Sequence, residues 1–131
     1  MAETYTIAQL ANEFGITPRA IRFYEDKNLL APSRQGLNRI YSRRDRARLA
    51  LILRGKRLGF RLDDIKEMLD LYDHGDGQIE QMQFTLDRSR DRVAELERQR
   101  RDVDDAIREL KDIVKMIERE LVARRAAEKA A

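Results

Sequence analysis

Residues 5–30, with the sequence YTIAQLANEFGITPRAIRFYEDKNLL, decide the fold. Thr6 and Gln9 stand at capping-box spacing, in which a hydroxyl and an amide satisfy free backbone groups of a first helical turn. Gly15 follows where a left-handed residue ends a helix. The apolar positions between them recur at helical spacing: Ile7, Leu10, Ala11 and Phe14. The segment therefore predicts a short amphipathic helix.

A second helix is predicted over residues 17–28. Thr17 is placed as its N-cap, and Pro18 takes the first helical position, where its missing N–H costs nothing. Two short helices joined by a glycine turn, with Arg19 and Arg22 near the start of the second, are typical of a helix-turn-helix motif. In that motif the second helix enters the major groove of DNA. A small helical hairpin packed in a core remains the alternative.

The next residues predict a wing and two more helices. Gly36 lies within residues 33–41 (SRQGLNRIY), which favours a short two-stranded hairpin. Ser42 starts a third helix that runs through Leu58 and is closed by Gly59. The apolar face expected on this helix consists of Ala47, Ala50, Leu51, Leu53 and Leu58. A fourth helix is expected over residues 62–72, from the spacing of Leu62, Ile65, Leu69 and Tyr72.

Residues 73–77 (DHGDG) predict a hinge-like linker, in which His74 is a solvated loop residue. Beyond them a heptad seam runs through Ile79, Met82, Leu86, Ser89, Val93, Leu96, Arg100, Val103, Ile107, Leu110, Val114, Ile117 and Leu121. A helix of about 46 residues reaches roughly 70 Å at 1.5 Å per residue, too long for one small domain to cover. The seam therefore predicts a homodimer.

The two polar seam positions, Ser89 and Arg100, indicate the direction of the partner helix. If they face one another across an antiparallel pair, Val93 faces Leu96, and every other layer is apolar against apolar. A shift of one heptad would bury unpaired polar groups, at about 1–3 kcal/mol each. The expected dimer is an antiparallel coiled coil. Val114, Ile117 and Leu121 then reach the partner near residues 68–75, against Met68, Leu71 and Tyr72.

Charge divides the chain in the same place. Residues 34–61 carry ten basic side chains against one acid, Asp45, whereas residues 73–131 are slightly acidic. Arg and Lys bind nucleic acids by displacing the counterions of the phosphates, so the basic run predicts a phosphate-binding surface. A solvated helix face is the other interpretation of a charge run.

Composition excludes several classes of site. The 131 residues include no Cys and a single His, which rules out thiolate metal sites, disulfides, cysteine nucleophiles and a multi-histidine site within one subunit. No catalytic constellation is present, and no metal or cofactor is expected. No apolar stretch is long enough for a membrane span, and Met1–Thr6 lacks the features of a signal peptide. These observations predict a soluble, cytoplasmic protein that is not an enzyme.

Over residues 5–73 the sequence resembles the MerR family of bacterial transcription regulators. The resemblance rests on AIRFYE (20–25), on Arg39-Ile40-Tyr41 in the wing and on Leu58-Gly59-Phe60. LILRGKRLGF (51–60) is most similar to cysteine-free regulators of branched-chain amino acid and acyl-CoA catabolism. The resemblance implies a mainly all-α fold, a winged helix-turn-helix with a long antiparallel coiled-coil dimerisation helix. The implied domains are residues 1–72 for DNA binding, 73–77 as linker, 78–123 as coiled coil and 124–131 as tail.

The family also implies how the protein works. A homodimer binds an inverted repeat in double-stranded promoter DNA and distorts the promoter spacer so that RNA polymerase can engage both promoter elements. The implied DNA-binding residues are Arg19, Arg22, Tyr24, Arg34, Arg39, Tyr41, Arg43, Arg44, Lys56 and Arg57, with Arg22 at a base edge and Tyr24 at the backbone. The dimerisation residues are Ile79, Met82, Leu86, Val93, Leu96, Val103, Ile107, Leu110, Val114 and Ile117.

Two points stay open. An architectural, excisionase-like protein that bends DNA without an effector is the alternative function, and a coiled-coil scaffold with an incidental basic domain is a third. A small-molecule effector is possible, but the sequence does not identify it.

The chain departs from the family pattern in two places. Where the family usually has Gly, this chain has Asn28, which tolerates the left-handed conformation. The wing has Leu37-Asn38 in place of the usual Gly-Tyr and a shorter loop.

Overall fold

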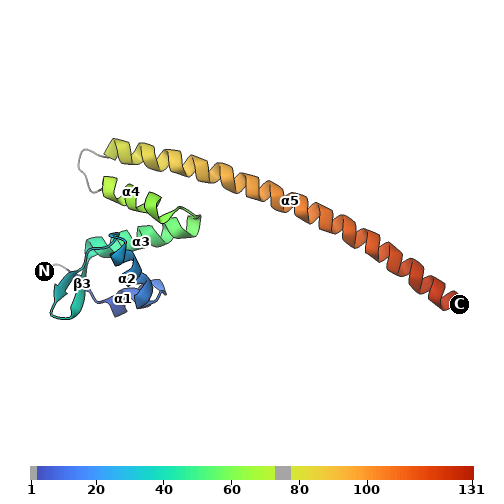
Figure 1. The fold of residues 1–131 in the computed structure, drawn as a ribbon, viewed down its shortest axis with the longest axis horizontal. Helices are drawn as coiled ribbons and strands as arrows, with labels where there is room; N and C mark the ends of the chain where they lie inside the picture. Colours follow the sequence, from blue (N-terminus) through green and yellow to red (C-terminus); the bar gives the residue numbers. More distant parts are fainter. Residues whose placement is uncertain (1–2, 73–77) are drawn as a thin grey trace. The chain divides into compact units, whose positions relative to one another are not determined.

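The computed structural model describes residues 3–72 and 78–131, which fall into two compact units, Met1–Ser89 and Arg90–Ala131 (Figure 1). The predicted linker at residues 73–77 lies outside the described residues. The elements, in order, are β1 (Thr4–Tyr5), α1 (Ile7–Phe14), α2 (Pro18–Asp26), β2 (Ser33–Gln35), β3 (Asn38–Ser42), α3 (Arg43–Leu58), α4 (Leu62–Tyr72) and α5 (Gln78–Ala130).

The predicted helix signals are confirmed. Thr6 Oγ1 accepts a hydrogen bond from Gln9 N at 3.1 Å, and Gln9 Oε1 accepts one from Thr6 N at 2.9 Å, which completes the capping box of α1. Gly15 is left-handed, with φ 65°, and ends this helix. Asn28 has φ 63° after α2, so this asparagine takes the turn conformation that glycine would otherwise supply.

The wing contains the predicted hairpin and one further strand. β2 and β3 pair antiparallel around Gly36, with Gln35 opposite Asn38. β1, a strand of two residues that pairs with the other edge of β3, was not predicted from the sequence. The strand order β1-β3-β2 makes β3 the central strand and turns one of its faces toward the helices.

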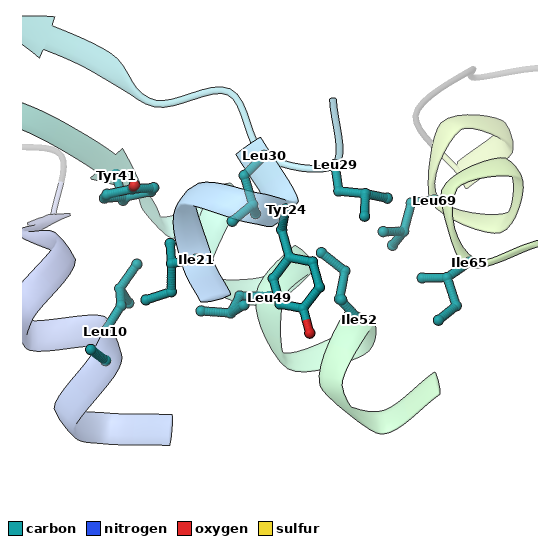
Figure 2. Packing of buried hydrophobic residues seen from close by; sticks show 11 residues of the cluster. Leu10, Ile21, Tyr24, Leu29, Leu30, Tyr41, Leu49, Ile52, Ile65 and Leu69 are labelled. Atoms are coloured by element: carbon teal, nitrogen blue, oxygen red, sulfur yellow. The ribbon is translucent and has the colours of Figure 1, made fainter. Parts of the chain in front are cut away.

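The core of the first unit is small and apolar (Figure 2). Tyr41 lies with Leu10 and Ile21 at one end, and Ile65 and Leu69 of α4 close the other end. The remaining buried members are Ala11, Tyr24, Leu29, Leu30, Leu49 and Ile52. α2 and the wing both contribute side chains to this core, which holds the two elements together.

The structure corrects the face predicted for α3. Leu49 and Ile52 are fully buried, whereas Leu51 and Leu58 are about half exposed, so the buried face is rotated from the one expected. Apolar residues occupy several sides of this helix, and their spacing alone therefore could not select the face. Leu51 and Leu58 instead line a cavity of about 270 Å³ with residues of α4 and the first turns of α5.

The predicted tail at residues 124–131 is also corrected. α5 continues to Ala130, so all but the last residue of that segment are helical. The sequence RRAAEKA (124–130) contains strong helix formers and neither Gly nor Pro, and nothing in it stops the helix.

Candidate nucleic-acid interface

The solvent-facing side of α2 carries the predicted recognition residues. Thr17 Oγ1 accepts a hydrogen bond from Ala20 N at 3.1 Å, and Pro18 occupies the first turn, which fixes where the helix begins. From that start, Ile21 points into the core and Arg19 and Arg22 are exposed. These two guanidinium groups lie three residues apart, on one side of the helix.

Phe23 belongs to the same exposed side of α2. This residue is 46% exposed, so its ring is accessible at this surface. The ammonium nitrogen of Lys27 lies 5.6 Å from the ring centroid. No role was predicted for Phe23 from the sequence, although its position next to Arg22 and off the buried stripe is a usable signal.

Tyr24 is a core residue. Its side chain is only 7% exposed, and its ring meets that of Phe23 edge to face, with centroids 5.8 Å apart. Burial raises the pKa of its hydroxyl. The apolar environment that holds α2 in place encloses the ring, which leaves only the hydroxyl end of Tyr24 for the predicted contact with the DNA backbone, and that contact stays a prediction.

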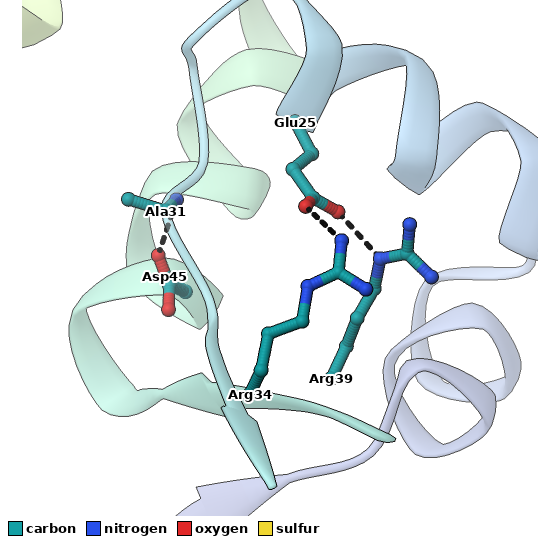
Figure 3. Close-up of polar contacts among 5 residues, drawn as sticks. All are labelled: Glu25, Ala31, Arg34, Arg39 and Asp45. Atoms are coloured by element: carbon teal, nitrogen blue, oxygen red, sulfur yellow. Dashed lines mark hydrogen bonds and ion pairs between the residues drawn. The ribbon is translucent and has the colours of Figure 1, made fainter. Parts of the chain in front are cut away.

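The two predicted wing arginines lie opposite one another and share one partner. Arg34 of β2 pairs in register with Arg39 of β3. Glu25, near the end of α2, accepts from Arg39 Nε at 2.7 Å through Oε2 and from Arg34 Nη2 at 3.3 Å through Oε1 (Figure 3). The structure thus brings the wing arginines together and ties both to the recognition helix, through an acid that the sequence analysis did not single out.

Tyr41, predicted as a wing contact, is turned into the core instead of toward the solvent. It is fully buried, and its hydroxyl has no hydrogen-bond partner among the described residues. Burial, followed by the negative charge of Glu25, raises its pKa to about 12. The pairing of Tyr5 with Tyr41 makes β3 a central strand and explains the correction, since a side chain on its inner face points at the helices.

The basic residues at the start of α3 are set by a buried carboxylate. Asp45 accepts hydrogen bonds from Ser42 N at 2.9 Å and Ser42 Oγ at 3.0 Å, and its other oxygen accepts from Ala31 N at 3.2 Å (Figure 3). This network fixes the turn between wing and helix. Arg43 and Arg44 are exposed there, and Arg43 Nε lies 3.8 Å from a carboxylate oxygen of Glu3.

Lys56 and Arg57 are exposed in the last turn of α3. Lys56 lies thirteen positions after Arg43, which is about 20 Å along the helix at 1.5 Å per residue. The two basic groups of α3 therefore do not form one cluster. They stand at opposite ends of the helix, where two separate phosphate contacts are possible.

Part of the basic run serves the protein itself. Arg46 Nε lies 2.8 Å from Glu13 Oε2, and this hydrogen bond raises the pKa of Arg46. Arg48 is largely buried and donates from Nε to the backbone oxygen of Leu29 at 2.8 Å. The number of basic residues in 34–61 therefore overestimates how many basic side chains are directed outward.

The predicted dimerisation residues all lie on α5, and each is at least 42% exposed in the single chain. Four more apolar side chains are exposed near its C-terminal end: Ile113, Met116, Leu121 and Val122. Exposed apolar surface of this extent is typical of interaction sites.

Residues 3–72 and 78–131 contain no helix with the length and apolar character of a membrane span. In the same ranges no group of three or more His, Cys, Asp or Glu side chains is arranged to hold a metal ion.

Comparison with known proteins agrees with this geometry. The family described as "MerR HTH family regulatory protein" matches residues 5–71, and the one described as "MerR, DNA binding" matches residues 46–113. The transcriptional activator mta of Bacillus subtilis is 44% identical over 68 residues, which cover 50% of this chain and 26% of mta. The regulator CueR of Escherichia coli O157:H7 is 33% identical over 94 residues, 70% of this chain and 67% of CueR. Several other relatives match over about half of their length.

Solved structures show the same fold. HiNmlR, a MerR family regulator lacking the sensor domain and bound to promoter DNA, has a TM-score of 0.62 and 28% identity, with 78% of this chain and 80% of that chain covered. MtaN, the N-terminal part of the Bacillus subtilis multidrug transporter activator, has a TM-score of 0.62 and 30% identity, with coverage of 84% and 97%. The chain belongs to the MerR family of DNA-binding transcriptional regulators.

Proposed function

We propose that this regulator binds an inverted-repeat promoter site as a homodimer and acts by distorting the promoter spacer. The observation that carries the proposal is the exposed side of α2, with Arg19 and Arg22, beside a wing whose two arginines are ion-paired to the same helix. One rigid unit thus offers a helix for the major groove and basic groups for the flanking phosphates.

Base recognition is assigned to α2. The exposed guanidinium of Arg22 suits the bidentate contact that arginine makes with guanine in the major groove. Phe23 has no polar atom for a phosphate, and its exposed ring suits an apolar contact such as a thymine methyl. Arg34, Arg39, Arg43, Arg44, Lys56 and Arg57 are proposed as backbone contacts, which fix register without carrying sequence information.

The dimer is proposed as an antiparallel coiled coil of α5 in which facing residues follow the Val93–Leu96 register. The exposed seam supports it, as does the chemistry of the other registers, which bury Arg100 or Ser89 against apolar side chains. The partner's helix end, with Val114, Ile117 and Leu121, is proposed to cover the cavity that Leu51, Leu58 and Met68 help to line. The dimer then sets the distance between its two α2 helices, and hence the half-site spacing.

Distortion of the spacer follows from that fixed distance. Two half-sites held at a separation that straight DNA does not offer are both engaged only if the DNA bends or untwists, at a cost offset by backbone contacts. We propose that RNA polymerase engages the promoter elements once the spacer is distorted. The proposed location of the regulator is the cytoplasm. The architectural, excisionase-like alternative lacks a need for the long seam, which favours the regulator.

A small-molecule effector is part of the proposal. The cavity between α3, α4 and the first turns of α5 is lined by apolar side chains together with Gln81, Thr85 and Ser89. The similarity to regulators of acyl-CoA catabolism makes acyl-CoA compounds the first candidates to test.

Footprinting of the promoter upstream of the gene that encodes this chain tests the proposal. We expect two protected half-sites related by inversion, with enhanced cleavage between them where the DNA is deformed. In vitro transcription should respond when the spacer of that promoter is shortened by one or two base pairs. Protection of a single half-site, or protection with no effect of spacer length on transcription, would contradict the proposal. Footprints with and without acyl-CoA test the effector.

A further inference from the structure

Glu25 lies where the recognition helix meets the wing, and it is the shared partner of both wing arginines (Figure 3). Its side chain is 18% exposed, whereas that of Arg39 is 26% and that of Arg34 is 51% exposed. The carboxylate is therefore mostly shielded, whereas Arg34 is exposed and Arg39 is partly exposed.

The sheet register makes this acid necessary. Arg34 and Arg39 are directly opposed across an antiparallel pair, so their side chains leave the same face of the hairpin. Two positive charges so placed repel one another and would spread apart. Each of the two carboxylate oxygens of Glu25 accepts a hydrogen bond from one arginine, which offsets part of the repulsion and restrains both side chains.

We propose that Glu25 is a positioning residue for DNA binding, one that holds the wing arginines ready for the phosphate backbone. The inference rests on the proposed function of the wing. Arg39 uses Nε for Glu25, so both of its Nη groups stay available as donors, and Arg34 uses only one Nη group. A long side chain that is already ordered loses less entropy when it meets a phosphate.

This role predicts an effect opposite in sign to that of simple charge. Removal of a negative charge from a DNA-binding surface should strengthen binding. Glu25→Gln should instead weaken it, because a neutral amide neither neutralises nor orders two guanidinium groups. We expect the dissociation constant to rise about threefold to tenfold, since two side chains must then be ordered on binding.

The experiment measures binding by fluorescence anisotropy across a salt series. The probes are a duplex of the chain's own upstream promoter region and a scrambled duplex of equal length. For Glu25→Gln we expect weaker binding to both, and a salt dependence that is shallower by about one to two phosphate contacts. A fraction of unfolded protein would lower the active concentration and leave that slope unchanged, so the slope separates positioning from folding.

Two further variants complete the test. Asp26→Asn removes a neighbouring, exposed acid of the same helix and should leave affinity unchanged or raise it. In an Arg34→Ala/Arg39→Ala background, Glu25→Gln should have no further effect. The inference is overturned if Glu25→Gln binds as tightly as the parent or tighter, or if it weakens binding equally in that background. Equal affinity of the parent for both duplexes would instead contradict the proposed function.

Discussion

The phenol ring of Tyr41 is buried in the core, and its hydroxyl has no hydrogen-bond partner among the described residues. A buried polar group without a partner costs about 1–3 kcal/mol. The ring itself packs between α1, α2 and the wing, so the apolar part of the side chain contributes stability and the hydroxyl subtracts from it.

Replacement of Tyr41 by Phe should therefore keep or raise the free energy of unfolding, by about 1 kcal/mol at neutral pH. The pKa of Tyr41, about 12 in the folded protein against 10.0 ordinarily, adds a pH test. Because the pKa is higher in the folded protein, ionisation of Tyr41 favours the unfolded chain. Its effect on the free energy of unfolding is therefore absent below pH 10, and the free energy of unfolding falls as the pH rises toward 12. Chemical denaturation between pH 8 and 12 should show a smaller alkaline loss in Tyr41→Phe. Identical pH dependences would contradict the assignment, since Tyr5 and Tyr24 are present in both proteins.

Arg22 and Arg44 separate base contact from backbone contact. Arg22→Ala should cost about 1–3 kcal/mol on the promoter site and relax specificity, because a base edge loses its partner. Arg44→Ala should weaken binding to all sequences and flatten the salt slope by about one contact. Anisotropy with promoter and scrambled duplexes measures both. If each variant changed binding to the two duplexes equally, Arg22 would not be a base contact.

At the scale of elements, α3 and α4 approach one another over a glycine. A Cβ added to Gly55 would lie 2.9 Å from both Cδ1 and Cγ1 of Ile65, a side chain that is buried in the core. The missing side chain of Gly55 is thus what lets the two helices pack this closely.

Gly55→Ala tests that contact. At a solvent-exposed helix position, the change from Gly to Ala would raise the free energy of unfolding by up to about 1 kcal/mol through helix propensity. Here overpacking, at about 1–3 kcal/mol, should exceed the gain and lower the free energy of unfolding by about 1 kcal/mol. Thermal and urea unfolding measure it. The double variant with Ile65→Ala should be less destabilised than the sum of the two single changes, and strict additivity would show that the two sites do not meet.

The wing and the start of α3 form a second junction, through two carboxylates. Glu25 joins α2 to the wing. Asp45 joins Ser42 to Ala31, which lies between α2 and β2. The sequence predicted each element and the cap at Ser42, but not the contacts of Glu25 with Arg39 and of Asp45 with Ala31, because each of these joins residues 14 positions apart, outside the reach of helical or hairpin spacing.

At the scale of the whole molecule, the seam of α5 makes a testable statement about dimer geometry. In the proposed register Val93 faces Leu96 of the partner, and Ile79 faces Leu110. Val93→Cys chains mixed with Leu96→Cys chains should form interchain disulfides under mild oxidation, read by non-reducing gel electrophoresis. The absence of cysteine from the natural sequence removes any background.

The pair Ile79→Cys and Leu110→Cys provides the control, because it lies far from the dyad. Mixed chains should crosslink and Ile79→Cys alone should not. Efficient crosslinking of Ile79→Cys to itself would show a parallel dimer instead.

Sequence alone determined what depends on local order. Caps, glycine stops and apolar periodicity placed α1, α2, α4 and the hairpin, and the AIRFYE signature (20–25) indicated the family, because these signals act over a few residues. Only the tertiary structure decided which side of each element is buried. It turned α3 onto Leu49 and Ile52, drew Tyr24 and Tyr41 into the core and set Glu25 between two arginines. Those outcomes depend on contacts between distant segments, such as the pairing of Tyr5 with Tyr41, and no local spacing encodes them.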